Sequence, residues 1–255
     1  MRIVIKVGTS TLTHATGHVN IRRMEGLVKV LSDLKNAGNE VILVSSGAIG
    51  MGVGKLNLKE KPQDMPGKQA AAAVGQCELM YTYDRMFSEY NHTVAQILLT
   101  GEDLENAERR ANFENTIETL LHLGALPVIN ENDTIATAEI KVGDNDTLGA
   151  LVAQSVQADL LVLLSDIDGL YTADPHKNAE AQLIAAVEEI TPAIEELAGD
   201  TGSCLGTGGM ATKIKAARMV MEQGCDMVIA SGSRPSLLYD IVEGKAVGTR
   251  FLGRK

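Results

Sequence analysis

The sequence is poor in aromatic residues and in cysteine, and both shortages limit what the protein can be. Tryptophan is absent and aromatic residues make up only 3% of the 255 residues, whereas hydrophobic residues make up 45%. The chain is therefore globular rather than disordered, and aliphatic side chains and methionine must fill its core, which favours layered strands and helices. The three cysteines lie far apart without a C-x-x-C pair, so neither a disulfide framework nor a zinc site is indicated.

Long apolar runs and basic clusters are also missing. No run approaches the ~20 apolar residues of a membrane span, and the opening MRIVIKVGTS is too short and too broken by Lys6 for a signal peptide. The net charge is −10, and no block of Lys and Arg is dense enough to bind nucleic acid. We expect a cytoplasmic protein without membrane or nucleic-acid partners. Because the chain is acidic, any site that binds an anion must bring several of its Lys or Arg side chains together.

Apolar runs typical of strands alternate with amphipathic stretches typical of helices. Strands are expected at RIVIKV, EVILVSS, HTVAQILLT, ALPVI, ADLLVLLS and CDMVIA, and helices at residues 20–38, about 67–90, 107–123, 145–157 and 210–224. The stretch GAIGMGVG is expected to be a glycine-rich turn, and residues 166–190 a hairpin and loop inserted on the sheet. This alternation predicts a parallel sheet with helices on both faces.

Two of the expected helices show a clear apolar face. Asn20 is the expected cap of the first, which Gly38 ends. Its inward residues are expected to be Ile21, Met24, Leu27, Val28, Leu31 and Leu34. Those of the helix at 210–224 are expected to be Met210, Ile214, Ala217, Val220 and Met221.

Five polar or glycine-rich segments fall where such a fold binds ligands, outside the carboxyl ends of strands or at the start of a helix. They are KVGTS (6–10), SSGAIGMG (45–52), NENDT (130–134), SDIDGLYTADP (165–175) and GTGGMATK (206–213). Glycine with Ser or Thr frees backbone N–H groups, and a helix N-terminus adds partial positive charge. Each segment alone is more often an ordinary turn, but together they indicate a phosphate site.

Two familiar phosphate motifs fit less well. The Walker A pattern is absent, because no Gly-Lys pair is followed by Ser or Thr, which argues against a P-loop NTPase. The dinucleotide fingerprint G-x-G-x-x-[GA] is matched by Gly206, Gly208 and Ala211, with Asp226 twenty residues beyond Gly206. That motif requires a strand just before its glycines, and EELAGDTGSCL is polar and glycine-broken. An oxidoreductase on this motif stays an alternative.

The stretch NENDTIATAEIKVGDNDTLGA (130–150) crowds carboxylates and amides between two very apolar runs. Together with KVGTS, SSGAIGMG, SDIDGLYTADP and GTGGMATK, in that order, it resembles the amino acid kinase family over nearly the whole chain. KVGTS and GTGGMATK indicate only the broad family. NENDTIATAEIKVGDND is more specific and is similar to the members that phosphorylate glutamate. Ser165 departs from the pattern, since Thr is expected there.

The resemblance implies a single three-layer α/β/α sandwich with a mainly parallel central sheet. Its amino-terminal half, about 1–150, would bind glutamate, and its carboxy-terminal half, about 151–255, would bind ATP. The implied reaction is ATP plus L-glutamate giving glutamyl 5-phosphate, the first step of proline biosynthesis. Many members carry a carboxy-terminal PUA domain. The sequence stops at Lys255, so the expectation is a kinase domain alone.

The resemblance also implies roles for individual residues. Lys6, Lys213 and Asp146 would be catalytic, and Ser46, Asp133 and Asn145 would bind glutamate. No residue would bind metal directly, since ATP would carry Mg²⁺, with Asp144 as a support. The residues that would hold ATP are Lys6, Gly8, Ser165, Asp166, Thr207, Gly208, Gly209, Met210, Ala211, Thr212 and Lys213.

The implied partners are glutamate, proline as feedback inhibitor, further copies of the chain in a dimer or tetramer, and functionally glutamyl phosphate reductase. Three alternatives stay open besides this function. They are a family member acting on another carboxylate, the dinucleotide-dependent oxidoreductase, and an amino-acid sensor without turnover. Retention of both Lys6 and Lys213 argues against the sensor.

Overall fold

The computed structural model describes residues 1–14, 16, 18–136, 144–175, 177–178, 180–199 and 209–254. Its eight-stranded sheet has the order β3-β4-β2-β1-β5-β7-β8-β6. The strands are β1 (Arg2–Val7), β2 (Glu40–Ser45), β3 (Val94–Leu99), β4 (Leu126–Glu131), β5 (Leu160–Ser165), β6 (Ala186–Val187), β7 (Asp226–Ser231) and β8 (Thr249–Phe251). The helices are α1 (Thr9–Leu12), α2 (Ile21–Asn36), α3 (Ala48–Lys55), α4 (Met65–Ser88), α5 (Gly101–Glu105), α6 (Ala107–His122), α7 (Asn145–Ser155), α8 (Pro192–Gly199), α9 (Met210–Met221) and α10 (Leu237–Val242).

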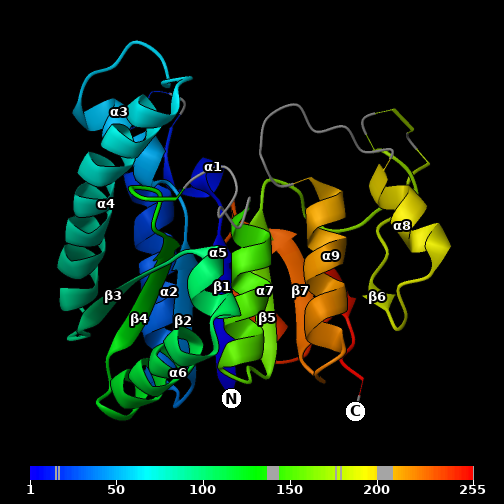
Figure 1. Cartoon of the computed structure of the whole chain (residues 1–255). Helices are drawn as coiled ribbons and strands as arrows, with labels where there is room; N and C mark the ends of the chain where they lie inside the picture. Colours follow the sequence, from blue (N-terminus) through cyan, green and yellow to red (C-terminus); the bar gives the residue numbers. More distant parts are fainter. Residues whose placement is uncertain are drawn as a thin grey trace.

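Six strands, β3, β4, β2, β1, β5 and β7, run parallel, so the expectation of a mainly parallel sheet is confirmed. Among the eight strands of the described sheet, β7 pairs antiparallel with β8, and β6 then pairs parallel to β8 at the edge. The amino terminus begins β1 at the lower edge of the sheet in Figure 1. The carboxyl ends of the six parallel strands therefore meet at the upper edge, where ligands of such sheets bind.

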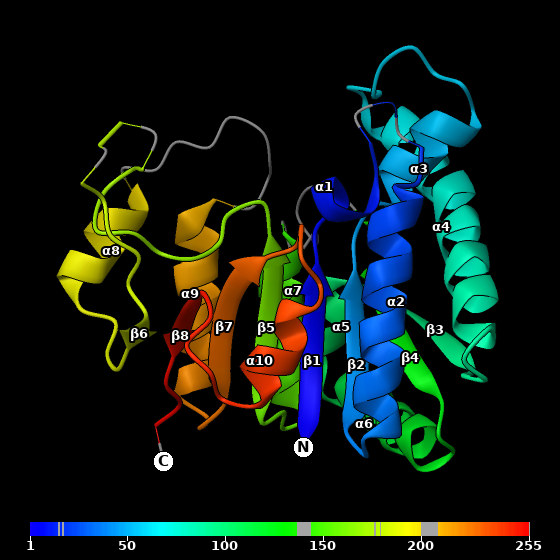
Figure 2. The ribbon, with the colours of Figure 1, turned by 180° about the vertical axis from the view of Figure 1, so that it is seen from behind.

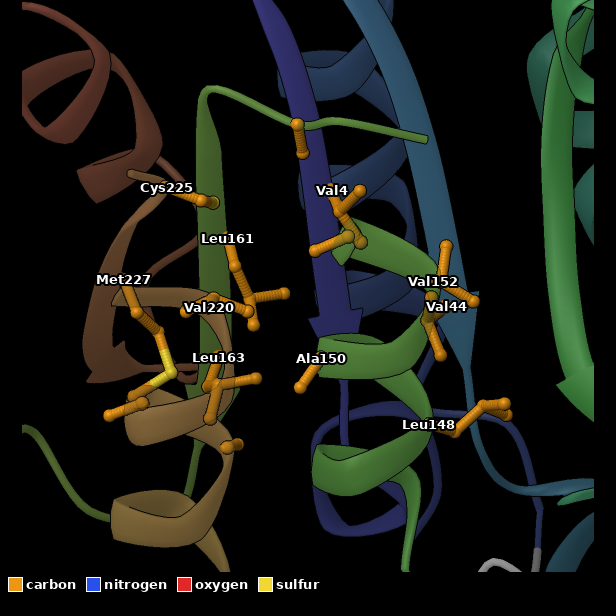
Figure 3. Close-up of a cluster of buried hydrophobic side chains, with 14 of the residues drawn as sticks. Val4, Val44, Leu148, Ala150, Val152, Leu161, Leu163, Val220, Cys225 and Met227 are labelled. Carbon is orange, nitrogen blue, oxygen red and sulfur yellow. The ribbon is translucent and has the colours of Figure 1, made fainter. Parts of the chain in front are cut away.

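Helices cover both faces of the sheet and complete the three-layer sandwich. Helices α6, α7 and α9 pack on one face, and α2, α4 and α10 on the other (Figures 1 and 2). In Figure 3, aliphatic side chains of β1, β2 and β5 meet those of α7. Because the central strands are buried on both faces, they read as continuous apolar runs rather than as alternating ones.

The apolar-face predictions are confirmed with one exception. The side chain of Asn20 accepts a hydrogen bond from the backbone N–H of Arg23 and caps α2. Gly38 follows the helix with a φ of +89°, which glycine adopts without strain. Ile21, the first residue of α2, was expected inside but is 59% exposed. All five inward residues expected of α9 are buried.

The expected turn at GAIGMGVG is wrong, because most of this stretch is helix α3. Only Gly47 makes a turn, with a φ of +105°. Gly52 in α3 and Gly75 in α4 allow the two helices to pack closely against each other. A Cβ on Gly52 would lie 1.8 Å from the carbonyl oxygen of Ala71, and one on Gly75 would lie 1.7 Å from that of Ala48.

The stretch between β5 and α8 agrees with the expected hairpin and loop. Tyr171 and Leu183 form an isolated antiparallel bridge, and β6 follows at the sheet edge. Helix α8 was not predicted from the sequence. Within the described residues, no helix is both long and apolar enough to span a membrane.

Candidate active site

Three charged side chains predicted to act together meet at the upper edge of the sheet. The ammonium of Lys6, near the end of β1, lies 2.6 Å from Oδ1 of Asp146, and that of Lys213 lies 2.9 Å from Oδ2. Lys213 comes from the first turn of α9, and Asp146 from the first turn of α7. One carboxylate therefore holds two lysines that are 207 residues apart in the chain.

The three side chains are almost fully removed from water. Asp146 is 1% exposed, Lys213 3% and Lys6 8%. The stem of Lys6 packs against Gly149 of α7, where a Cβ would lie 3.4 Å from the Cβ of the lysine. Burial by itself would raise the pKa of Asp146. The charges and hydrogen bonds of Lys6 and Lys213 outweigh it and hold that pKa below its ordinary value, so the carboxyl stays ionised.

The neighbouring residue of α7, Asn145, belongs to a second cluster. Its side-chain amide donates to the carbonyl of Ser45 at 3.0 Å and to the hydroxyl of Ser46 at 2.5 Å, both at the end of β2. The same amide lies 3.3 Å from Oδ1 of Asn130 in β4. The structure thus brings together Ser46 and Asn145, two of the residues expected to bind glutamate.

The side chain of Asp144 caps the N-terminus of helix α7. The carboxylate of Asp144 accepts from the backbone N–H of Thr147 at 2.8 Å and from its hydroxyl at 2.9 Å. A capping carboxylate at a helix N-terminus is favoured by the helix dipole. Asp144, the expected support for Mg²⁺, therefore has a structural role in this conformation, although its side chain remains partly exposed.

The third expected glutamate residue, Asp133, lies in the turn that follows β4 and is partly exposed. It is three residues beyond Asn130, whose side chain belongs to the Asn145 cluster. The turn is held by backbone hydrogen bonds from Asn132 to Leu99 and from Ala136 to Asn132. The rest of this acidic stretch before α7, residues 137–143, lies outside the described residues.

The residues expected to hold ATP come from three segments at the same edge. The backbone N–H of Gly8 faces the carbonyl of Leu164 at 3.4 Å, a long hydrogen bond that a phosphate would have to replace. Ser165 ends β5, and its hydroxyl donates to Asp166 at 2.9 Å. Gly209 caps α9, where Met210 is buried and Ala211 exposed.

The start of α9 is tied to the lysine pair. The hydroxyl of Thr212 donates to the carbonyl of Gly209 at 2.8 Å and lies 3.3 Å from Oδ2 of Asp146. Thr207 and Gly208, also expected at ATP, lie outside the described residues. The last described element before them is helix α8, and the residues directly before Gly206, where a dinucleotide fingerprint requires a strand, also lie outside the described part of the chain.

Sequence reasoning missed two side chains that complete the Asn145 cluster. Asn130 donates to Oε1 of Gln76 in α4 at 2.9 Å, and its own Oδ1 accepts from the backbone N–H of Glu131. Asn130 stood in the acidic stretch but was given no role. Gln76 lies inside an alanine-rich helix and carried no local signal; only the contact of α4 with β4 reveals it.

Among the described residues, no group of three or more His, Cys, Asp and Glu is placed to hold a metal ion. Mg²⁺ keeps several waters and usually reaches proteins through substrate phosphates and one or two carboxylates. The residues present fit a magnesium ion that arrives with a nucleotide.

Comparison with known sequences gives one family and many similar proteins. The model of the amino acid kinase family matches residues 1–231. Glutamate 5-kinase of Clostridium perfringens is 53% identical over 258 residues, covering all of this chain and 96% of that protein. Glutamate 5-kinase of Moorella thermoacetica is 55% identical over 254 residues, covering all of this chain and 67% of that protein.

Solved structures share the fold at low identity. Carbamate kinase from Giardia lamblia bound to AMP-PNP matches with a TM-score of 0.71 and 18% identity, covering 99% of this chain and 98% of that one. UMP kinase from Bacillus anthracis matches with a TM-score of 0.66 and 15% identity, covering 100% and 96%. At these identities the two structures establish the fold alone.

Proposed function

The chain belongs to the amino acid kinase family, and we propose that it transfers the γ-phosphoryl group of ATP to the side-chain carboxylate of L-glutamate. The product is glutamyl 5-phosphate, in the first step of proline biosynthesis. The full-length relatives named glutamate 5-kinase support this substrate. One structural observation carries the proposal. The first turn of α7 joins an amide and hydroxyl cluster, through Asn145, to a buried lysine pair, through Asp146.

The amide and hydroxyl cluster suits an amino acid. Glutamate presents one ammonium and two carboxylates, so its site must offer both acceptors and donors. Asp133 supplies a carboxylate for the ammonium, and Ser46 and Asn145 supply polar groups at the floor of the site. We assign these three residues to glutamate and the amino-terminal half, about 1–150, to its binding.

The lysine pair suits the phosphates of ATP. Gly8 and Ser165 lie at the carboxyl ends of β1 and β5, Asp166 follows Ser165, and Gly209–Lys213 form the start of α9. The N-terminus of α9 adds partial positive charge. Mg²⁺ carried by ATP would neutralise phosphate charge, with Asp144 as a candidate support. We assign ATP to these residues and to the carboxy-terminal half, about 151–255.

The reaction requires no general base. The attacking oxygen belongs to a carboxylate with an ordinary pKa of about 4.3, so it is already ionised at neutral pH. A bond forms between this oxygen and the γ-phosphorus while the bond from the γ-phosphorus to the ADP oxygen breaks. The obstacle is repulsion between two anions, so catalysis consists of positioning and charge neutralisation. Lys6 and Lys213 supply the charge.

Asp146 then acts as a positioning residue for both lysines. Two ammonium groups would repel each other at a site this dry, and the carboxylate between them fixes where each one lies. A pre-placed charge costs no reorganisation when negative charge moves onto the phosphoryl oxygens. The single carboxylate leaves the pair with a net positive charge, which an incoming phosphate can use.

A comparison of four acceptors tests the proposal. Purified protein is incubated with ATP, Mg²⁺ and glutamate, aspartate, N-acetylglutamate or carbamate. ADP release is measured together with trapping of the acyl phosphate by hydroxylamine. We expect ADP and hydroxamate in equal amounts with glutamate, and far less with the other three. N-acetylglutamate lacks the ammonium, so turnover equal to that with glutamate would overturn the assignment of the site. ADP without hydroxamate would show an ATPase.

The family resemblance adds proposals about setting and regulation. The chain acts as one kinase domain in the cytoplasm, as a dimer or tetramer, and its product passes to glutamyl phosphate reductase. Proline shares the ammonium and α-carboxylate of glutamate and inhibits in competition with it, through the loop at 133–142. A series of glutamate titrations at several millimolar proline concentrations tests this, and unchanged activity would refute it.

A further inference from the structure

One polar group beside the Asn145 cluster lacks a partner within the described part of the chain. Gln76 is 7% exposed, and its Nε2 is fully buried without a hydrogen-bond acceptor. Burying an amide donor unpaired costs about 1–3 kcal/mol. Such groups are rare in folded proteins and call for an explanation, of which a missing ligand is one.

The hydrogen bonds around Gln76 fix which end of its amide is the free one. Oδ1 of Asn130 accepts from the backbone N–H of Glu131 at 2.9 Å, so the amide nitrogen of Asn130 must face the other way. That nitrogen donates to Gln76, so Gln76 must present its oxygen there. The nitrogen of Gln76 is therefore the group left over, and rotating the amide by 180° would only place two donors against each other.

The chain of hydrogen bonds connects Gln76 to the residues assigned to glutamate. Gln76 is bonded to Asn130, Asn130 faces Asn145, and Asn145 donates to Ser46. The amide hydrogens of Asn145 are already directed at the oxygens of Ser45, Ser46 and Asn130. In this conformation Asn145 has no donor to spare for a substrate.

The α-carboxylate of glutamate needs N–H or O–H donors, and it must lie away from the phosphoryl end. Lys6 and Lys213 are drawn to Asp146 at that end. Resting on the proposed function, we propose that Gln76 is a specificity-determining residue whose Nε2 donates to the α-carboxylate of bound glutamate. Its Oε1 meanwhile keeps Asn130, and through it Asn145, in place.

A comparison of two ligands tests this role. Glutamate carries the α-carboxylate, whereas 4-aminobutyrate has the same ammonium and acceptor carboxylate without it. Gln76→Met removes the amide with little change in size. We expect kcat/KM for glutamate to fall about 10- to 100-fold, as for loss of a hydrogen bond to a charged group. For 4-aminobutyrate, kcat/KM should change less than about 3-fold, which is the variation expected for a residue that does not contact the ligand. If turnover of 4-aminobutyrate is too slow to measure, its inhibition constant against glutamate is measured instead and should stay within the same range.

Two further variants distinguish loss of the Nε2 donor of Gln76 from loss of its Oε1 acceptor and from a general loss of stability. Gln76→Glu keeps an oxygen for Asn130 but places a carboxyl where the N–H donor was, and it should show the same selective loss. Gln63→Met makes the same Gln-to-Met change at an exposed glutamine whose amide donates to the nearby carbonyl of Lys61, and it should leave the kinetics with both ligands unaffected. Thermal unfolding of each variant shows that it is folded.

The outcomes are distinguishable. Equal losses with both ligands, or a lower unfolding temperature with an unchanged ratio between ligands, would overturn the role of Gln76 and indicate a structural amide satisfied by water. A wild-type protein that forms no hydroxamate from glutamate would instead overturn the proposed function itself.

Discussion

Replacing Asp146 with Asn should expose how much the lysine pair depends on one carboxylate. Asparagine has the same shape but no charge, and its amide can offer an oxygen to only one of the two ammonium groups. The other ammonium then meets an NH₂ donor. Because Asp146 is 1% exposed, water cannot replace the lost partner without rearrangement. The variant therefore removes the carboxylate charge that the two buried ammonium groups share.

The size of the effect follows from burial. Removing one partner of a buried ion pair typically costs about 3–5 kcal/mol. For a chain of this length, 1 kcal/mol corresponds to about 2–4 °C in the unfolding temperature, so the nucleotide-free variant should unfold about 6–20 °C lower. The phosphates of ATP would restore negative charge beside the lysines. A non-hydrolysable ATP analogue should therefore stabilise the variant by at least about 1.5 kcal/mol more than the wild type, the lower value for a hydrogen bond to a charged group.

Thermal unfolding with and without the analogue measures both quantities. Asp240→Asn is the matched control, since it breaks an ion pair with Lys245 on the surface, and it should change neither measurement. An unfolding temperature of Asp146→Asn equal to that of the wild type would show that the two ion pairs contribute nothing. A lower temperature with no additional response to nucleotide would show that the lysines do not face the phosphates.

Four further outcomes are expected. Lys213→Ala should lower kcat by about 10²–10³, because the charge it meets grows as the phosphoryl group moves, and an unchanged kcat in steady-state assays would place Lys213 outside the reaction. Asp133→Ala should raise the KM for glutamate but not that for ATP, because the substrate ammonium does not change during the reaction; the reverse pattern would mean that the acidic loop does not bind the amino acid. Gly75→Ala should destabilise the fold by about 1–3 kcal/mol or more in denaturant titrations, since its Cβ would lie 1.7 Å from the carbonyl oxygen of Ala48, and wild-type stability would contradict the close packing of α3 on α4. The stability gap between wild type and Asp146→Asn should close in acid: the pKa of Asp146 is lowered on folding, so its contribution is complete above about pH 4 and is lost as the pH falls through the folded value, whereas a constant gap from pH 7 to 3 would contradict this sign.

The sheet and its covering helices were predictable because their signals are local. Strands buried on both faces read as apolar runs, and amphipathic helices such as α2 show an apolar face. Errors arose where a residue serves a distant partner. The glycines of α3 read as a turn because the sequence does not show that α4 packs against them at Gly75. Ile21 fits the apolar period of α2 but is exposed at the first position of the helix, where periodicity alone does not show whether the sheet covers it.

The candidate site divides in the same way. Glycine and hydroxyl residues at strand ends identified the edge, and the family resemblance supplied the residue roles. The pairing of Lys6 and Lys213 through one carboxylate follows from how α7 packs on β1 and β5 and against α9, which no spacing in the sequence encodes. Gln76 could not be predicted from the sequence, because a glutamine within a helix gives no sign of function until its hydrogen-bond partner in β4 is known.

The adjacency of Asn145 and Asp146 has a consequence for the reaction. Asn145 is bound to the ends of β2 and β4, where we place the amino acid, and Asp146 to Lys6 and Lys213, where we place the phosphates. Because the two residues share one peptide bond in a capped helix turn, the separation between the two ligand sites is fixed by backbone geometry. Phosphoryl transfer needs the attacking oxygen, the phosphorus and the leaving oxygen nearly in line. A rigid turn between the sites meets that requirement without relying on long side chains, so displacement of α7 should disturb alignment even where every side chain at the site is retained.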